Sequence, residues 1–129
     1  VTDVTGFGLV GHLLEMLRAS GADARVDLPA IALLDGVKDA LAAGTTSSMQ
    51  PQNLRQGSSI RNFVEASAHP LFAALFDPQT AGGLLAGVPR ARASACVDAL
   101  RAAGYVDAAV VGEVLARSQD AAALTIAVR

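Results

Sequence analysis

Two glycine-rich segments carry the residue types that could do chemistry in this chain. Residues 1–11, VTDVTGFGLVG, place a carboxylate, two hydroxyls and three glycines before an apolar run. Residues 75–85, LFDPQTAGGLL, place a second carboxylate, a threonine and a glycine pair before another apolar run. Glycine lets a backbone approach a ligand closely and leaves N–H groups free to donate. Both segments are therefore predicted to be loops that bind a phosphate or a metal-bound phosphate. Because each leads into an apolar element of one small core, both loops are expected to lie at the same edge of the sheet.

The residue pattern leaves a second interpretation open. TGFG is neither a P-loop nor the G-x-G-x-x-G pattern of dinucleotide-binding proteins. Both segments can be tight turns that are rich in glycine, with Asp3 as a turn carboxylate and Thr5 as the cap of the following helix. Capping and phosphate binding are compatible roles for Thr5.

The two segments together resemble the C-terminal domain of the selenophosphate synthetase (selenide, water dikinase) family. TDVTGFGLVGHLLEM is similar to the start of that domain and LFDPQTAGGLLAGVP to its middle, in the same order. DPQT followed by a small residue and GG is the more specific match. TDxTGxG-type openings recur across the superfamily that includes aminoimidazole ribonucleotide synthetase and thiamine monophosphate kinase. The resemblance covers nearly the whole chain and is weakest in its middle.

The resemblance implies an enzyme that converts ATP, selenide and water to selenophosphate, AMP and phosphate. It implies that Asp3 helps to hold Mg²⁺ on the nucleotide phosphates. One aspartate suffices chemically, because Mg²⁺ takes oxygen ligands and usually only one or two carboxylates. The residues expected to bind the phosphates or nucleotide are Thr5, Gly6, Gly8, Asp77, Thr80, Gly82 and Gly83. The catalytic residues are unknown, because the family's Sec or Cys and Lys belong to an N-terminal region outside this sequence.

The resemblance also implies partners. Residues 1–129 are expected to form a single domain, the C-terminal part of a larger enzyme. Its N-terminal ATP-binding domain would make the homodimer, and the isolated chain would be inactive. Two alternatives remain: the C-terminal domain of a sibling enzyme such as aminoimidazole ribonucleotide synthetase, or a non-catalytic ligand-binding module.

The sequence departs from the family pattern at two places. Ala81 stands where family members usually have serine, which removes a side-chain hydrogen bond but leaves the backbone argument intact. SSMQPQNLR replaces the commoner proline-glycine-glycine turn. The family carries an asparagine near its active site in this region, and Asn53 and Asn62 are both candidates for that role.

Composition narrows the function classes. The chain has 129 residues, 52% of them hydrophobic, which is enough for one globular domain with a core. The net charge is −2 and the arginines are scattered, so the sequence shows no basic patch that would bind nucleic acid or a membrane surface. The single cysteine rules out an intrachain disulfide and favours a cytoplasmic setting.

The periodicity predicts an α+β fold with helices packed on a mixed sheet, like the C-terminal domain of aminoimidazole ribonucleotide synthetase. Strands are expected at 1–4, 24–28, 84–88 (buried), 108–114 and 123–128. Helices are expected at 7–20, 35–43, 70–76 and 90–103, with a polar loop over 45–59.

Three further side chains receive structural interpretations. His12 lies one turn into the first helix and is expected to be a hydrogen-bonded packing residue. His69 precedes a proline and is expected in an exposed loop. Cys96 lies on the apolar stripe of the helix at 90–103 and is expected to be a buried thiol.

Overall fold

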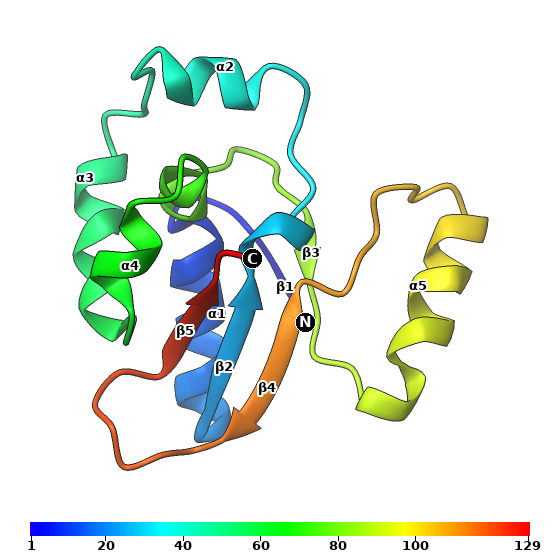
Figure 1. Cartoon of the computed structure of the whole chain (residues 1–129). Coiled ribbons are helices and arrows are strands. Elements are labelled where there is room, and N and C mark those ends of the chain that lie inside the picture. The colour runs from blue at the N-terminus through cyan, green and yellow to red at the C-terminus, as the bar shows by residue number, and fades with distance from the viewer.

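A three-stranded mixed sheet forms the centre of the protein, whose computed structural model describes all 129 residues. β2 (Ala22–Asp27) is the middle strand, antiparallel to β4 (Gly112–Ala116) and parallel to β5 (Leu124–Ala127). Figure 1 shows the three strands side by side with helices around them. The predicted α+β fold with a mixed sheet is therefore confirmed, and β4 and β5 flank β2 on either side.

A second, very short sheet pairs β1 (Thr2–Asp3) with β3 (Leu84–Leu85), antiparallel. The prediction of a buried strand over 84–88 is wrong, since β3 has two residues and Leu84 is 78% exposed. The physical reason is that β3 has a single partner strand, and successive side chains of a strand point to opposite faces. The face that carries Leu84 is left open to solvent.

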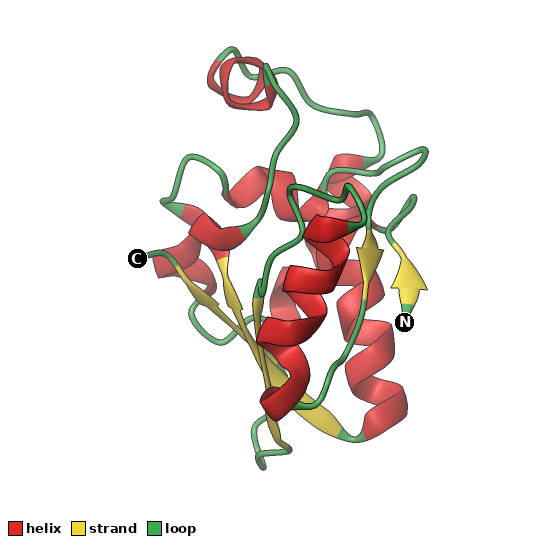
Figure 2. Ribbon diagram, turned by 90° about the vertical axis from the view of Figure 1, so that its right-hand side faces the viewer, coloured by secondary structure: helices red, strands yellow, loops and turns green.

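The first helix, α1 (Gly8–Ser20), lies along one face of the three-stranded sheet, as Figures 1 and 2 show. Its apolar face enters the core, where Val10, Leu13, Leu14 and Leu17 are buried. The helix ends as predicted at Gly21, which takes the left-handed conformation with φ 58°. Its start differs from the prediction: Phe7 occupies the N-cap position, and Thr5 makes no capping hydrogen bond.

The segment predicted as a loop over 45–59 is not helical up to residue 49, but it forms two short helical elements from residue 50 on. These are α3 (Gln50–Asn53), with Pro51 in its first turn, and the 3₁₀ turn η2 (Leu54–Ser59). The prediction failed because Gln50 and Asn53 are polar by type but buried in the structure. The remaining elements of this half are η1 (Leu28–Ala30), α2 (Val37–Ala42), α4 (Phe63–Ser67) and η3 (Phe72–Phe76).

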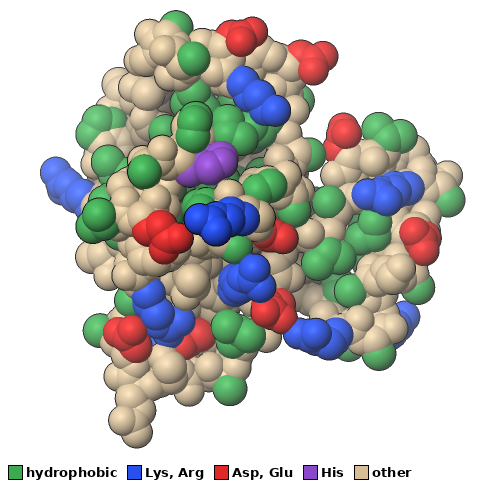
Figure 3. Space-filling view, in the orientation of Figure 1, with side chains coloured by type: hydrophobic (Ala, Val, Ile, Leu, Met, Phe, Trp, Pro, Cys, Tyr) green, Lys and Arg blue, Asp and Glu red, His purple; other side chains and the backbone are tan.

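The helix α5 (Ala93–Ala102), preceded by η4 (Arg90–Arg92), stands apart from the rest of the fold in Figure 1. None of its residues is buried, and Cys96 is only half-buried, so the expectation of a buried thiol is wrong. No sheet face packs against this helix, which leaves its apolar stripe partly open. Figure 3 shows apolar side chains on the part of the molecule that contains α5, where this part faces the main body.

No helix has the length and apolar character needed to span a membrane.

Candidate functional site

The two glycine-rich loops lie against each other. Val4 donates its backbone N–H to the carbonyl oxygen of Gly83 over 2.9 Å, and Gly82 donates back to Val4 over 3.1 Å. Thr5, the next residue of the first loop, accepts the N–H of Gln79 at its carbonyl oxygen over 3.0 Å. These bonds extend the short β1–β3 sheet into both loops, so the prediction that the loops share one edge is confirmed.

Two of the loop glycines are required by the fold itself. Gly8 has φ +70°, and a Cβ on it would lie 2.9 Å from the carbonyl carbon of Phe76. A Cβ on Gly82 would overlap the carbonyl oxygen of Val4. Both positions therefore need glycine because two backbones approach closely there, whether or not a ligand binds.

The other two loop glycines meet no such constraint. A Cβ on Gly6 or on Gly83 would have no atom within 4 Å, and neither residue has a positive φ. Gly83 is exposed and Gly6 is half-buried. Packing therefore does not explain why these positions lack a side chain, and the backbone there is open to a molecule that approaches from outside.

Asp3 presents a free carboxylate beside this edge. It is exposed, whereas the next residue, Val4, is buried in the core, as the alternation of β1 requires. No hydrogen bond or ion pair engages the Asp3 carboxylate. The structure has no group of three or more His, Cys, Asp or Glu side chains that could hold a metal ion. What the edge offers a hard cation is one unengaged carboxylate, which fits a metal that takes its other ligands from phosphates and water.

The hydroxyl of Thr5 is engaged by a histidine. Its Oγ1 lies 3.1 Å from Nε2 of His12, whose Nδ1 lies 3.4 Å from a carboxylate oxygen of Glu15. His12 is 8% exposed and packs beside the ring of Phe7. It is thus the hydrogen-bonded packing residue that its position predicts, and it fixes the side chain of Thr5 within the first loop.

The second loop holds two polar side chains that bond each other and one that is free. A carboxylate oxygen of Asp77 accepts a hydrogen bond from Nε2 of Gln79 over 2.9 Å. Thr80 is exposed and its hydroxyl makes no hydrogen bond within the chain. Asp77 therefore shapes the loop, whereas Thr80 is available to a ligand.

The structure separates the two asparagines that the sequence left as alternatives. Asn53 is 3% exposed, and its Nδ2 donates to the carbonyl oxygens of Gly6 and Phe76, at 2.8 and 3.0 Å. Asn62 instead bridges to the backbone of Ile126, donating to its oxygen over 2.7 Å and accepting from its nitrogen over 3.0 Å. Only Asn53 contacts the glycine-rich loops.

His69 is half-buried, which corrects the expectation of an exposed loop residue. Its Nδ1 accepts the backbone N–H of Leu71 over 3.2 Å, which holds the ring against the start of η3.

The surface has two hollows. One of about 390 Å³ is lined in part by His69, and a second of about 560 Å³ lies beside α5. Neither hollow includes a residue of the two loops.

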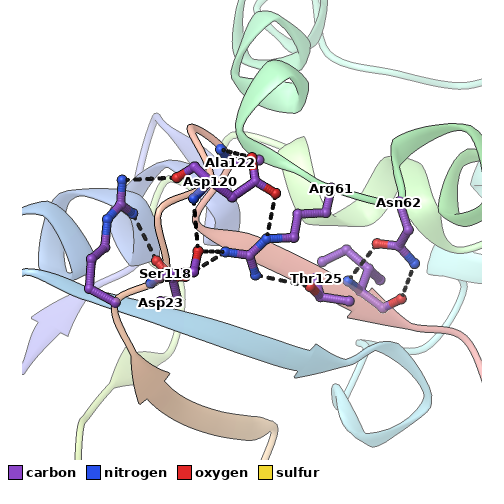
Figure 4. A network of polar contacts seen from close by, with 9 residues as sticks. Asp23, Arg61, Asn62, Ser118, Asp120, Ala122 and Thr125 are labelled. Atoms are coloured by element: carbon purple, nitrogen blue, oxygen red, sulfur yellow. Dashed lines mark hydrogen bonds and ion pairs between the residues drawn. The ribbon is translucent and has the colours of Figure 1, made fainter.

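Sequence reasoning missed a polar network around Asp23, drawn in Figure 4. The Asp23 carboxylate is almost fully buried and pairs with Arg61 and, over 2.8 Å, with Arg117. The oxygen that pairs with Arg61, Oδ2, also accepts the backbone N–H of Ser118 over 3.0 Å. The network joins β2 to two segments that are remote in the sequence, and the spacing of charges along the chain gives no indication of it.

These contacts determine the ionisation of Asp23. The side chain of Ser118 is the largest cause, followed by the backbone of Ser118 and the guanidinium groups of Arg61 and Arg117, and together they hold the pKa of the Asp23 carboxyl well below its usual range. Burial acts in the opposite direction and is outweighed. The three partners of Asp23 lie outside the glycine-rich loops. We therefore assign the Asp23 carboxylate a structural role.

Both a family model and curated proteins match nearly the whole chain. The family model described as AIR synthase related protein, C-terminal domain, matches residues 1–124. A selenide, water dikinase of Myxococcus xanthus is 44% identical over 90% of the chain and 33% of its own length. One from Aeromonas hydrophila is 38% identical over 92% of the chain and 33% of its own length. The selenide, water dikinase 2 of Peptoclostridium acidaminophilum is 33% identical over 92% of the chain and 34% of its own length.

The chain spans about one third of the length of these curated relatives. Because the family model matches nearly the whole sequence, the chain belongs to the AIR synthase related protein, C-terminal domain family, and the relatives it resembles are selenide, water dikinases.

Proposed function

We propose that this chain is the C-terminal domain of a selenide, water dikinase and that its paired glycine-rich loops bind the phosphates of ATP. The relatives named above support the activity. The phosphate role is supported mainly by Gly6 and Gly83, which lie on adjoining loops and have free space where a Cβ would be. Neither packing nor backbone conformation requires glycine there, whereas a phosphate that approaches the backbone does.

Each loop residue has a role in this proposal. Asp3 contributes a carboxylate to Mg²⁺ on the nucleotide, and the metal neutralises phosphate charge when bound. Gly6 and Gly83 offer open backbone, and Thr80 offers a free hydroxyl. Gly8, Gly82 and Asp77 hold the loops in place, and Thr5 is oriented by His12. Phosphoryl transfer depends mainly on such positioning and charge stabilisation.

The rest of the reaction belongs, in this proposal, to other parts of a longer enzyme. Residues 1–129 form one domain, and an N-terminal domain binds most of the ATP, supplies the catalytic Sec or Cys and Lys, and makes a homodimer. The enzyme works in the cytoplasm on selenide. The chain alone is expected to fold without turning over ATP.

A product assay of the full-length gene product tests this function. With ATP, selenide and Mg²⁺, ³¹P NMR is expected to show selenophosphate, AMP and orthophosphate, and the 129-residue chain alone is expected to show none of them. ADP as the sole nucleotide product would identify a sibling enzyme of the superfamily. Binding of nucleotide without any turnover by the full-length protein would indicate a non-catalytic module.

A further inference from the structure

We infer that Asn53 is a positioning residue that sets how the two glycine-rich loops lie against each other and, through them, where the nucleotide phosphates lie. The effect on the phosphates rests on the proposed function. The effect on the loops stands on contacts within the chain alone.

One amide group joins the two loops. Nδ2 of Asn53 donates to the carbonyl oxygen of Gly6, in the first loop, over 2.8 Å. It also donates to the carbonyl oxygen of Phe76, directly before Asp77 opens the second loop, over 3.0 Å. An amide NH₂ has two hydrogens, so a single side chain supplies both bonds. At 3% exposure, Asn53 has little access to water that could replace it.

The helical turn that carries Asn53 is itself fixed. Gln50 lies three residues earlier on the same face of α3, and its Nε2 donates to the carbonyl oxygen of Ala73 over 2.8 Å. Gln50 is 8% exposed. α3 is therefore attached to η3 at two points, through Ala73 and Phe76. Because η3 holds Asn53 in place, the bond to Gly6 locates the first loop relative to the start of the second.

The need for a donor at this point follows from the crowding of backbone groups. Gly8 approaches Phe76 so closely that a Cβ on it would lie 3.1 Å from the Cα of Phe76. Two carbonyl oxygens within reach of one nitrogen both carry partial negative charge. Without the amide, the buried oxygen of Phe76 would remain unpaired, and the oxygen of the half-buried Gly6 would lose its donor. An unsatisfied buried acceptor is unfavourable, so the loops would separate or admit water.

Asn62 provides a matched control. It is also an asparagine whose Nδ2 donates to a backbone oxygen, here that of Ile126 on β5. Replacing either asparagine with aspartate keeps the shape, removes the donors and adds the same charge. Any effect that is specific to the glycine-rich loops must therefore appear for Asn53→Asp and not for Asn62→Asp.

Amide hydrogen exchange of the 129-residue chain, followed by NMR, tests the contact with the loops. In Asn53→Asp and Asn53→Ala, the protection of the Val4 and Gly82 amides is expected to fall about tenfold relative to the amides of β2, as expected when a buried donor is lost. Lowering the pH should restore part of this protection in Asn53→Asp, because the acid form of the carboxyl again donates one bond. Protection at Val4 and Gly82 equal to that in Asn62→Asp would overturn the inference.

Steady-state kinetics of the full-length protein test the consequence for the nucleotide. Asn53→Asp is expected to lower kcat/KM for ATP about tenfold or more, beyond any loss in Asn62→Asp at equal folded fraction. Equal losses in the two variants would overturn the positioning role while leaving the proposed function intact. A wild-type protein that makes no selenophosphate would refute the proposed function, and the exchange result would then decide alone whether Asn53 holds the loops.

Discussion

Gly82 donates its backbone N–H to the carbonyl oxygen of Val4 over 3.1 Å, and the two residues are so close that a Cβ on residue 82 would overlap that oxygen. Val4 is a buried core residue. The contact therefore joins the second glycine-rich loop directly to the core beneath the first loop. It also gives neighbouring glycines different roles, because Gly83 has open space around it.

Alanine substitution separates these two glycines by stability. Gly82→Ala is expected to destabilise the chain by about 1–3 kcal/mol, because the new methyl group forces the two backbones apart. Gly83→Ala should stay within about 0.5 kcal/mol of the wild type, as surface substitutions usually do. Urea unfolding of the 129-residue chain measures both. Equal destabilisation would mean that Gly83 is also a packing residue.

A larger substitution at Gly83 tests ligand approach. Gly83→Val in the full-length protein is expected to lower selenophosphate formation on the order of 10- to 100-fold, since a small displacement of bound phosphates has effects of that size. The thermal midpoint should change little, because a Cβ at this position meets no atom within 4 Å. A variant with normal turnover would remove the second loop from the site.

Neutralising Asp3 tests the metal role. Asp3→Asn keeps the shape of the side chain but loses the charge that a hard cation requires. The Mg²⁺ concentration for half-maximal turnover of the full-length protein is expected to rise about tenfold or more, the range typical of weakened metal sites. Stability should not change, since no group in the chain pairs with this carboxylate. Identical magnesium titrations would return Asp3 to a turn residue.

The Asp23 network predicts how stability depends on pH. The folded-state pKa of Asp23 is lowered, so its ionised form stabilises the fold above the ordinary aspartate pKa of about 3.9. That stabilisation is lost as the pH falls below this value towards the lower folded pKa. Asp23→Asn should lower the thermal midpoint at pH 7, because Arg61 and Arg117 lose their shared anion, and should flatten the decline at acid pH.

An exposed aspartate on α5 serves as the control for this experiment. Asp98 is exposed and makes no ion pair, so Asp98→Asn is expected to leave both the midpoint and its acid dependence as in the wild type. Parallel pH profiles for the wild type and Asp23→Asn would show that the network does not govern acid stability.

The sequence predicted what local pattern determines. The apolar period of α1 and the glycine that ends it were visible in the sequence, and both are confirmed. The joining of the two loops was also predictable, because each precedes an apolar element of one small core. These features depend on residues that are close in the sequence or on one shared core.

The largest misses depend on partners that are remote in the sequence. Asn53 and Asp23 are polar, and their burial is explained by contacts with Gly6 and Phe76 in the first case and with Ser118 and two arginines in the second. Likewise, the apolar runs of β3 and α5 predicted burial, but neither element has a second layer packed over it. Composition cannot indicate which apolar stripe receives a partner.

Hydrogen–deuterium exchange of the full-length protein with a non-hydrolysable ATP analogue and Mg²⁺ tests the central claim most directly. The account predicts that nucleotide slows exchange in peptides covering residues 1–8 and 77–83, and leaves β4 and β5 unchanged. Slower exchange confined to other parts of the domain, such as the hollow beside α5, with no change in either loop, would contradict it.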